Sequence, residues 1–198
     1  MFLYETWTCS TSKFDLNGYT VHNFYRKFRH RNARRCSGGV AFFYKNHLEN
    51  GIKVIKNHHD TIIWLTLNRN FFHNDKDIYI CGVYIWVEDS PSYNVVNTDL
   101  FELLENDIFV FEQLGSVNVT GDFNSRIGNK HDFIVNDCFN CFTDDNDYVP
   151  DMTSLRASIY NISNSHGIKL LDLCKSSSLR IVNGRIGDTC KYKYVSPR

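Results

Sequence analysis

Apolar and polar residues alternate along the first half of the chain in short runs of the kind that form half-buried β-strands. The apolar members are mostly β-branched or aromatic, and glycine, asparagine and charged residues separate the runs, as at turns. We therefore predict a series of strands before residue 90. They occupy residues 2–4, 19–25, 39–44, 52–55, 62–67 and 78–87.

The spacing of apolar residues changes to that of a helix after residue 97. Leucine, isoleucine and phenylalanine recur at intervals of three and four over residues 98–114, which predicts an amphipathic helix packed on a core. Thr98 is the expected N-terminal cap, and Gly115 is expected to end the helix.

The remaining apolar pattern adds a second helix over residues 163–176, with Ile168, Leu170 and Leu171 facing inward. Many strands with few helices predict an α/β fold with two packed, mainly antiparallel sheets and helices on the outer surfaces. The strands predicted in this half cover residues 117–120, 179–182 and 192–195.

Composition places the chain among globular proteins. With 198 residues, 42% of them hydrophobic, it is long enough to bury a core as one domain and too apolar to be disordered. The 22 basic residues balance 22 acidic ones, so net charge identifies no partner and only local clusters can.

Cysteine usage and the first residues bear on location. The seven cysteines are an odd number, and no second pair joins Cys138 and Cys141 to complete a zinc site. Reduced cysteines in an intracellular protein, nuclear or cytoplasmic, are the prediction. The apolar residues after Met1 end at the charged Glu5, which is too soon for the apolar region of a signal peptide. No apolar run is long enough to cross a bilayer. Neither a membrane nor an obligate protein partner is expected.

Polar residues that can carry chemistry gather where predicted strands end. Asp122 and Asn124 follow the strand at 117–120, and residues two apart on a strand point the same way. The carboxylate can take a proton or hold a metal, and the amide donates and accepts without changing charge. Such a pair suits a site that holds a water and a phosphate together. Three more strings, at 5–7, 37–41 and 83–85, also flank predicted strands.

These strings, in this order, resemble the endonuclease/exonuclease/phosphatase superfamily, and within it the apurinic-type endonuclease domains of LINE-type (non-LTR) retrotransposons. The resemblance implies a deoxyribonuclease I-like fold, a four-layer α/β/β/α sandwich, and a Mg²⁺-dependent endonuclease that nicks DNA, with Mn²⁺ as a possible substitute. The strings that carry it are E-T-W, S-G-G-V-A, G-V-Y, G-D-F-N-S-R-I-G, H-G-x-x-L-L-D-L-C and I-V-N-G-R.

The resemblance also implies a role for each matching residue. Glu5 corresponds to the magnesium ligand, and Asp122 to the aspartate that positions or deprotonates the attacking water. Asn124 corresponds to the asparagine that fixes this aspartate and contacts the scissile phosphate, and Tyr84 to a tyrosine at the phosphate. The residue types fit, because Mg²⁺ prefers carboxylates and water, and a carboxylate beside water can act as a general base.

A basic stretch at residues 26–35 is the strongest local charge. It could bind DNA phosphates, with each contact adding to affinity and to its salt dependence, or it could be a solvated surface. Both interpretations stay open. Its candidate DNA-binding residues are Arg29, Arg31, Arg34 and Arg35.

Other charged clusters have simpler explanations. Residues 144–147 resemble part of a calcium loop but lack its glycine and terminal glutamate, so we expect a solvated loop within a longer Asp- and Asn-rich loop over 136–151. The His-His-Asp string at 58–60 is expected to be a turn rather than a metal site.

Some features of the resembling family are missing. Its first strand, which carries an asparagine, lies upstream of the E-T-W string, and its last strands end in an S-D-H segment that this sequence does not contain. Tyr160 also stands where relatives often have an aspartate. Residues 1–198 are therefore predicted to be one partial domain with little activity by itself. The alternatives are an inactive remnant that binds nucleic acid weakly at most, and a phosphatase of the same superfamily.

Overall fold

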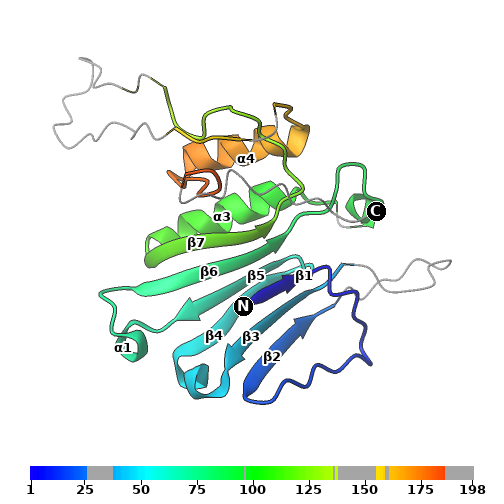
Figure 1. Ribbon diagram of the computed structural model, residues 1–198, viewed down its shortest axis with the longest axis vertical. Coiled ribbons are helices and arrows are strands. Elements are labelled where there is room, and N and C mark those ends of the chain that lie inside the picture. The colour runs from blue at the N-terminus through cyan, green and yellow to red at the C-terminus, as the bar shows by residue number, and fades with distance from the viewer. Residues whose placement is uncertain (26–37, 96, 136, 138–154, 159–160, 186–198) are drawn as a thin grey trace. The chain divides into compact units, whose positions relative to one another are not determined.

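An antiparallel sheet of three strands forms the beginning of the computed structural model, which describes residues 1–25, 38–95, 97–135, 137, 155–158 and 161–185. Its strands are β1 (Phe2–Tyr4), β2 (Tyr19–Phe24) and β3 (Val40–Lys45), in the order β1-β3-β2 (Figure 1). The first five residues of β3 are buried, since the strand lies between two others. The strands agree with the predicted runs to within a residue.

Four further strands form a second sheet, in the order β4-β5-β6-β7. The pairs β4–β5 and β5–β6 are antiparallel, whereas β6 and β7 are parallel, so the last two strands end at the same edge. His59 and Asp60 both have a positive φ in the β4–β5 turn, which confirms the turn predicted at 58–60. The strands are β4 (Ile52–His58), β5 (Ile62–Leu67), β6 (Asp77–Tyr84) and β7 (Gly115–Asp122).

Short helices connect the strands, and one longer helix crosses from β6 to β7. The short ones are the 3₁₀ helix η1 (Asn46–Gly51), α1 (Arg69–Phe72) and α2 (Ser92–Val95), and the longer one is α3 (Leu100–Glu112). Asp99 caps α3 by accepting a hydrogen bond from the Phe101 N–H at 2.9 Å. Our prediction that Thr98 is the cap was wrong by one residue, and Gly115 begins β7 rather than ending the helix.

The apolar face of α3 packs on one face of the second sheet. The Phe111 ring lies 4.6 Å from that of Trp64 on β5 and 4.9 Å from that of Tyr79 on β6, measured between centroids. Leu104 and Ile108 are buried in the same contact. The stripe predicted at helical spacing is therefore a core stripe.

The opposite face of the second sheet packs on the first sheet. The Phe2 ring lies so close to Gly82 on β6 that a side-chain carbon at Gly82 would overlap it. The Tyr4 hydroxyl donates a hydrogen bond to the Thr120 carbonyl on β7 at 3.0 Å, which ties the two sheets together. The protein is thus α/β, with two packed, mainly antiparallel sheets and helices.

The chain divides into two compact units, Met1–Asn124 and Ser125–Arg198, and every strand described above belongs to the first. The second contains α4 (Ser165–Ser176), whose N-terminal cap Asn164 accepts a hydrogen bond from the Gly167 N–H at 2.9 Å. Leu170 and Leu171 on α4 are buried as predicted. Ile168 is 47% exposed, which corrects its predicted inward position.

The strand predicted at 179–182 is not present. The Ile181 N–H donates to the Asp132 carboxylate at 2.8 Å instead of pairing with a strand, and Arg185 donates to the Ile181 carbonyl at 2.7 Å. The apolar residues here lie in a loop, which the ion pair between Arg185 and Asp132 holds in place. The strand predicted at 192–195 lies outside the described residues, as does nearly all of the loop at 136–151. Within the described residues, no helix is both long and apolar enough to span a bilayer.

Candidate active site

Glu5 and Tyr84 meet at the rim where the two sheets of the first unit end. Glu5 directly follows β1, its side chain is exposed, and its φ of 53° lies in the left-handed region. Tyr84 is the last residue of β6 and is 7% exposed. Its hydroxyl donates a hydrogen bond to the Glu5 carboxylate at 2.5 Å. The bond orients a carboxylate that otherwise faces solvent.

Asp122 lies beside Tyr84 at the end of β7. The two residues are partners in the parallel register, and the Ile85 N–H donates to the Asp122 carbonyl at 2.9 Å. Paired residues on adjacent strands point to the same face, so the Asp122 and Tyr84 side chains leave the sheet on the side of Glu5. Asp122 is exposed. Tyr84 therefore contacts Glu5 and pairs with Asp122, the two acidic residues that were predicted to share a site.

Asn124 closes the turn after β7. Its backbone N–H donates to the Asp122 carboxylate at 2.9 Å, and its side-chain amide donates to the Ile85 carbonyl at 2.7 Å. Its φ of 48° is uncommon for a residue other than glycine, and asparagine tolerates it better than most. The asparagine is thus linked to the aspartate through its backbone, while its side chain is fastened to the neighbouring strand end.

Two glycines, Gly121 and Gly39, allow the backbones at this rim to approach each other closely. Gly121 has a φ of 152° and lies against the Val83 backbone, where any side chain would overlap the Val83 carbonyl oxygen. Gly39 has a φ of 91°, and a side-chain carbon there would lie 2.6 Å from the Thr6 hydroxyl oxygen. Both glycines belong to the strings that singled out this region in the sequence.

The E-T-W and S-G-G strings contact each other directly. The Thr6 N–H donates to the Gly39 carbonyl at 3.3 Å, and the Trp7 N–H donates to the Gly38 carbonyl at 2.9 Å. Trp7 is 44% exposed and has a φ of 52°. The sequence drew attention to the string but assigned Trp7 no role.

Tyr4 is a second residue of this rim that sequence reasoning did not single out. Burial raises the pKa of its hydroxyl, and the charges of Cys81 and Asp122 add to the increase. The hydroxyl therefore stays protonated and remains a donor to Thr120, two residues before Asp122. Because Tyr4 also precedes Glu5, this bond fixes both carboxylate-bearing strand ends. Only the contact across the sheets reveals it.

The rim fits a hard divalent cation better than a soft one. It offers two exposed carboxylates, each with one oxygen accepting a hydrogen bond from within the rim. Mg²⁺ is usually held by one or two protein carboxylates and several waters, whereas a structural zinc needs four protein ligands. Among the described residues, no three His, Cys, Asp or Glu side chains gather as such a cage would require.

The His-His-Asp string at 58–60 has a structural contact, and the basic stretch is not among the described residues. His58 in the 58–60 turn contacts the buried Asp107 of α3 at 2.9 Å, and Lys56 contacts the same carboxylate, so this cluster joins β4 to α3. The candidate DNA-binding arginines lie outside the described residues. They are Arg29, Arg31, Arg34 and Arg35.

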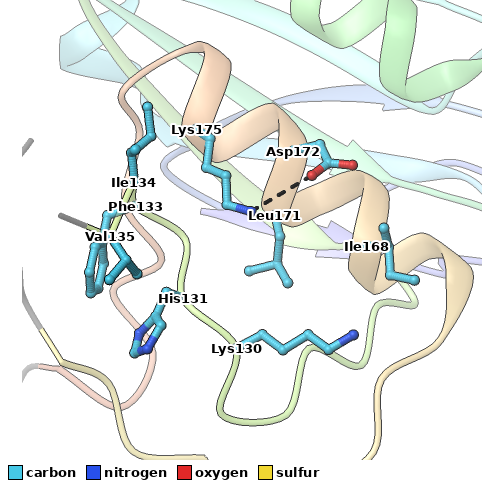
Figure 2. Close-up of a pocket in the computed structure, with 9 residues that line it drawn as sticks. All are labelled: Lys130, His131, Phe133, Ile134, Val135, Ile168, Leu171, Asp172 and Lys175. Carbon is cyan, nitrogen blue, oxygen red and sulfur yellow. Dashed lines mark ion pairs between the residues drawn. The ribbon is translucent and has the colours of Figure 1, made fainter. Parts of the chain in front are cut away.

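A cavity of about 540 Å³ lies within the second unit, beside α4 (Figure 2). Apolar side chains such as Phe133 and Leu171 line it together with Lys130 and Lys175. Among the described residues that line it, Asp172 is the one with a carboxylate, and it pairs with Lys175 at 3.9 Å. A single carboxylate held by a lysine does not offer the two-acid arrangement of the rim, so hydrolytic chemistry is better supported at the rim.

Comparison with known proteins adds no family to this picture: no protein-family model matches the chain, and no curated protein matches it either. The resemblance noted in the sequence therefore stays a prediction that rests on the motifs.

Proposed function

We propose that this protein is a Mg²⁺-dependent phosphodiester hydrolase that nicks DNA, of the endonuclease/exonuclease/phosphatase superfamily and the LINE-type retrotransposon class. A deoxyribonuclease I-like, four-layer arrangement belongs to the same proposal. The observation that carries it is the meeting of Glu5, Tyr84, Asp122 and Asn124 at one rim. They come from three strand ends that are far apart in sequence, and they are the four residues to which the motifs assign a role.

Each side chain has a role that its contacts support. Glu5 would hold the cation, Mg²⁺ or its substitute Mn²⁺, which when bound neutralises charge developing on the phosphoryl oxygens. Asp122 is exposed and held by the Asn124 N–H, so it can orient a water and accept its proton. Asn124 limits the freedom of that carboxylate. An oriented base of this kind contributes typically ~10²–10⁴-fold to a rate.

The hydrogen bond of Tyr84 gives it a more specific role than its correspondence to the family's tyrosine implies. A phenol has one O–H to donate, and here that hydrogen is used on Glu5. A donation to a phosphate oxygen therefore requires the hydroxyl to leave the carboxylate. Its first role in this proposal is to orient Glu5, and a phosphate contact follows only when substrate and cation arrive.

DNA as the substrate is supported by where the basic stretch joins the fold. The described residues on either side of it are Tyr25, which follows β2, and Gly38, which precedes β3. Gly38 accepts the Trp7 N–H and thus lies at the same end of the first sheet as Glu5. Residues 26–37 between these two ends contain the basic stretch, and its contact with DNA phosphates stays a prediction from the sequence.

The test is nicking of supercoiled plasmid by the purified chain with Mg²⁺. Because little activity is predicted for residues 1–198 by themselves, slow conversion to open circles by the wild-type chain, reduced at least ~10²-fold by Asp122→Ala, would support the proposal. Glu112→Ala is the matched control, because Glu112 is an exposed carboxylate at the end of α3. Equal nicking by Asp122→Ala would contradict the proposal, and no nicking by any variant would favour the inactive remnant instead. Release of phosphate from inositol phosphates without DNA nicking would favour the phosphatase alternative.

A further inference from the structure

Trp7 differs from the other tryptophans in its surroundings. Trp64 is 0% and Trp86 3% exposed, as expected for rings that serve a core, whereas Trp7 is 44% exposed. A large apolar ring in water costs free energy, since its surface stays hydrated. Single exposed apolar side chains are common on protein surfaces, but this exposed indole belongs to a residue two positions from Glu5, beside a candidate active site.

The backbone presents this ring in a fixed position. Trp7 has a φ of 52°, which is a genuine outlier for a bulky side chain. Its N–H is held by the Gly38 carbonyl at 2.9 Å, and the preceding Thr6 N–H is held by the Gly39 carbonyl at 3.3 Å. Strained residues held by their surroundings cluster at ligand-binding positions. The fold therefore fixes the backbone from which the indole projects.

Trp7 is also close in the chain to Glu5, one of the two carboxylates. Glu5 is two residues away and shares the left-handed conformation, with a φ of 53°. A strand of DNA whose phosphate reached Glu5 and Asp122 would bring its neighbouring sugars and bases over the same rim. Nucleobases have flat π-faces that stack on aromatic side chains regardless of sequence.

We propose that Trp7 is a base-stacking residue, which receives an unpaired nucleobase of the DNA strand whose phosphate is held at the rim. This inference deepens the proposed function and rests on it. Stacking requires a base with an exposed face, so Trp7 would favour single-stranded or locally opened DNA over a closed duplex. It would add little sequence preference.

The experiment compares two ligands of equal charge: an oligothymidylate, and an abasic deoxyribose-phosphate oligomer of the same length. Affinities are measured in the Asp122→Ala background, which keeps the DNA intact. The chain with Trp7 should prefer the oligothymidylate, and Trp7→Ala should lower affinity for it by about 5- to 150-fold without changing affinity for the abasic oligomer. Trp7→Phe should retain part of the preference.

The matched control is Tyr19→Ala. Tyr19 is 37% exposed on the same sheet, but it pairs with Lys45 at the end far from Gly38, so its removal should not alter the preference. Equal binding of the two ligands by the chain with Trp7 would overturn the inference, as would a Trp7→Ala variant that keeps the preference.

A measurement on the chain with its own Trp7 tests the inference even if the Trp7→Ala variant does not fold. Because Trp64 and Trp86 are buried, acrylamide should quench chiefly Trp7 fluorescence, and oligothymidylate should shield it. Bound DNA that leaves the quenching unchanged would refute the stacking role while leaving plasmid nicking, and so the proposed function, intact. Absence of any DNA binding together with absence of nicking would refute both.

Discussion

Replacing Arg185 with methionine would leave a buried carboxylate without its guanidinium. In the second unit, Arg185 donates two hydrogen bonds to Asp132, at 2.6 and 2.7 Å. The two side chains are 9% and 1% exposed, so water cannot replace the lost donors. Removing one partner of a buried pair typically costs ~3–5 kcal/mol. We expect a loss of that size in the free energy of local unfolding.

The loss should depend on pH in a direction that follows from the pKa of Asp132. Burial alone would raise this pKa, but the hydrogen bonds from Arg185 and Ile181 bring it below its ordinary value of 3.8. The pair therefore stabilises the fold fully above that value, and the contribution disappears as pH falls through the lower pKa of the folded state. In Arg185→Met, burial should instead favour the protonated acid. The difference between variant and wild type should therefore shrink as pH falls from the raised pKa of the variant to the lowered pKa of the wild type.

Hydrogen exchange of the α4 amides at low denaturant measures this local free energy without assuming that both units unfold together. Lys175→Met is the control, because it breaks an exposed pair with Asp172 and should cost less than ~1 kcal/mol. Asp132→Leu combined with Arg185→Met should recover only part of the loss, since an apolar pair needs no partner charge but the Ile181 N–H and carbonyl lose their partners. A loss under ~1 kcal/mol for Arg185→Met, or one that is the same at pH 3 and pH 7, would refute the reasoning.

Two further predictions concern the first unit. Tyr84→Phe removes the hydroxyl that orients Glu5, a hydrogen bond to a charged group worth ~1.5–3 kcal/mol, so the Mg²⁺ concentration for half-maximal nicking should rise at least ~10-fold; an unchanged Mg²⁺ midpoint would contradict the orienting role. Gly82→Ala pushes a methyl group into the Phe2 ring between the sheets and should destabilise the fold by ~1–3 kcal/mol in thermal unfolding, with Phe2→Leu partly relieving it; full stability of Gly82→Ala would argue against this sheet packing.

Much of the fold could be predicted from the sequence because the signal is local. Short runs of β-branched and aromatic residues mark β3 and β5, and helical spacing marks α3, whose buried face is set by its own sequence. A similar apolar run at 179–182 was misleading, since a strand also needs a neighbour to pair with. There the Ile181 N–H binds a carboxylate 49 residues away, which no local pattern reveals.

The sequence singles out residues that the fold brings to one rim, but not the hydrogen bonds that orient them. Motifs drew attention to Glu5, Tyr84 and Asp122; the register of β6 and β7 pairs Tyr84 with Asp122, and the Tyr84 hydroxyl contacts Glu5. Which groups orient them could not be deduced, since this depends on a contact between sheets and on turn geometry. Tyr4 is the clearest case: in the sequence it is one more aromatic of a short strand, and only the packed sheets give its hydroxyl a partner.

The hydrogen bond from Tyr4 to Thr120 also has a consequence for how the protein is made. Its partners are 116 residues apart in the chain, so the ribosome has released the first strand long before β7 exists. Contacts of such long sequence separation form late and slowly in folding. A nascent chain therefore carries its first carboxylate without the second, and any hydrolytic capacity would arise only after synthesis has passed the turn at Asn124.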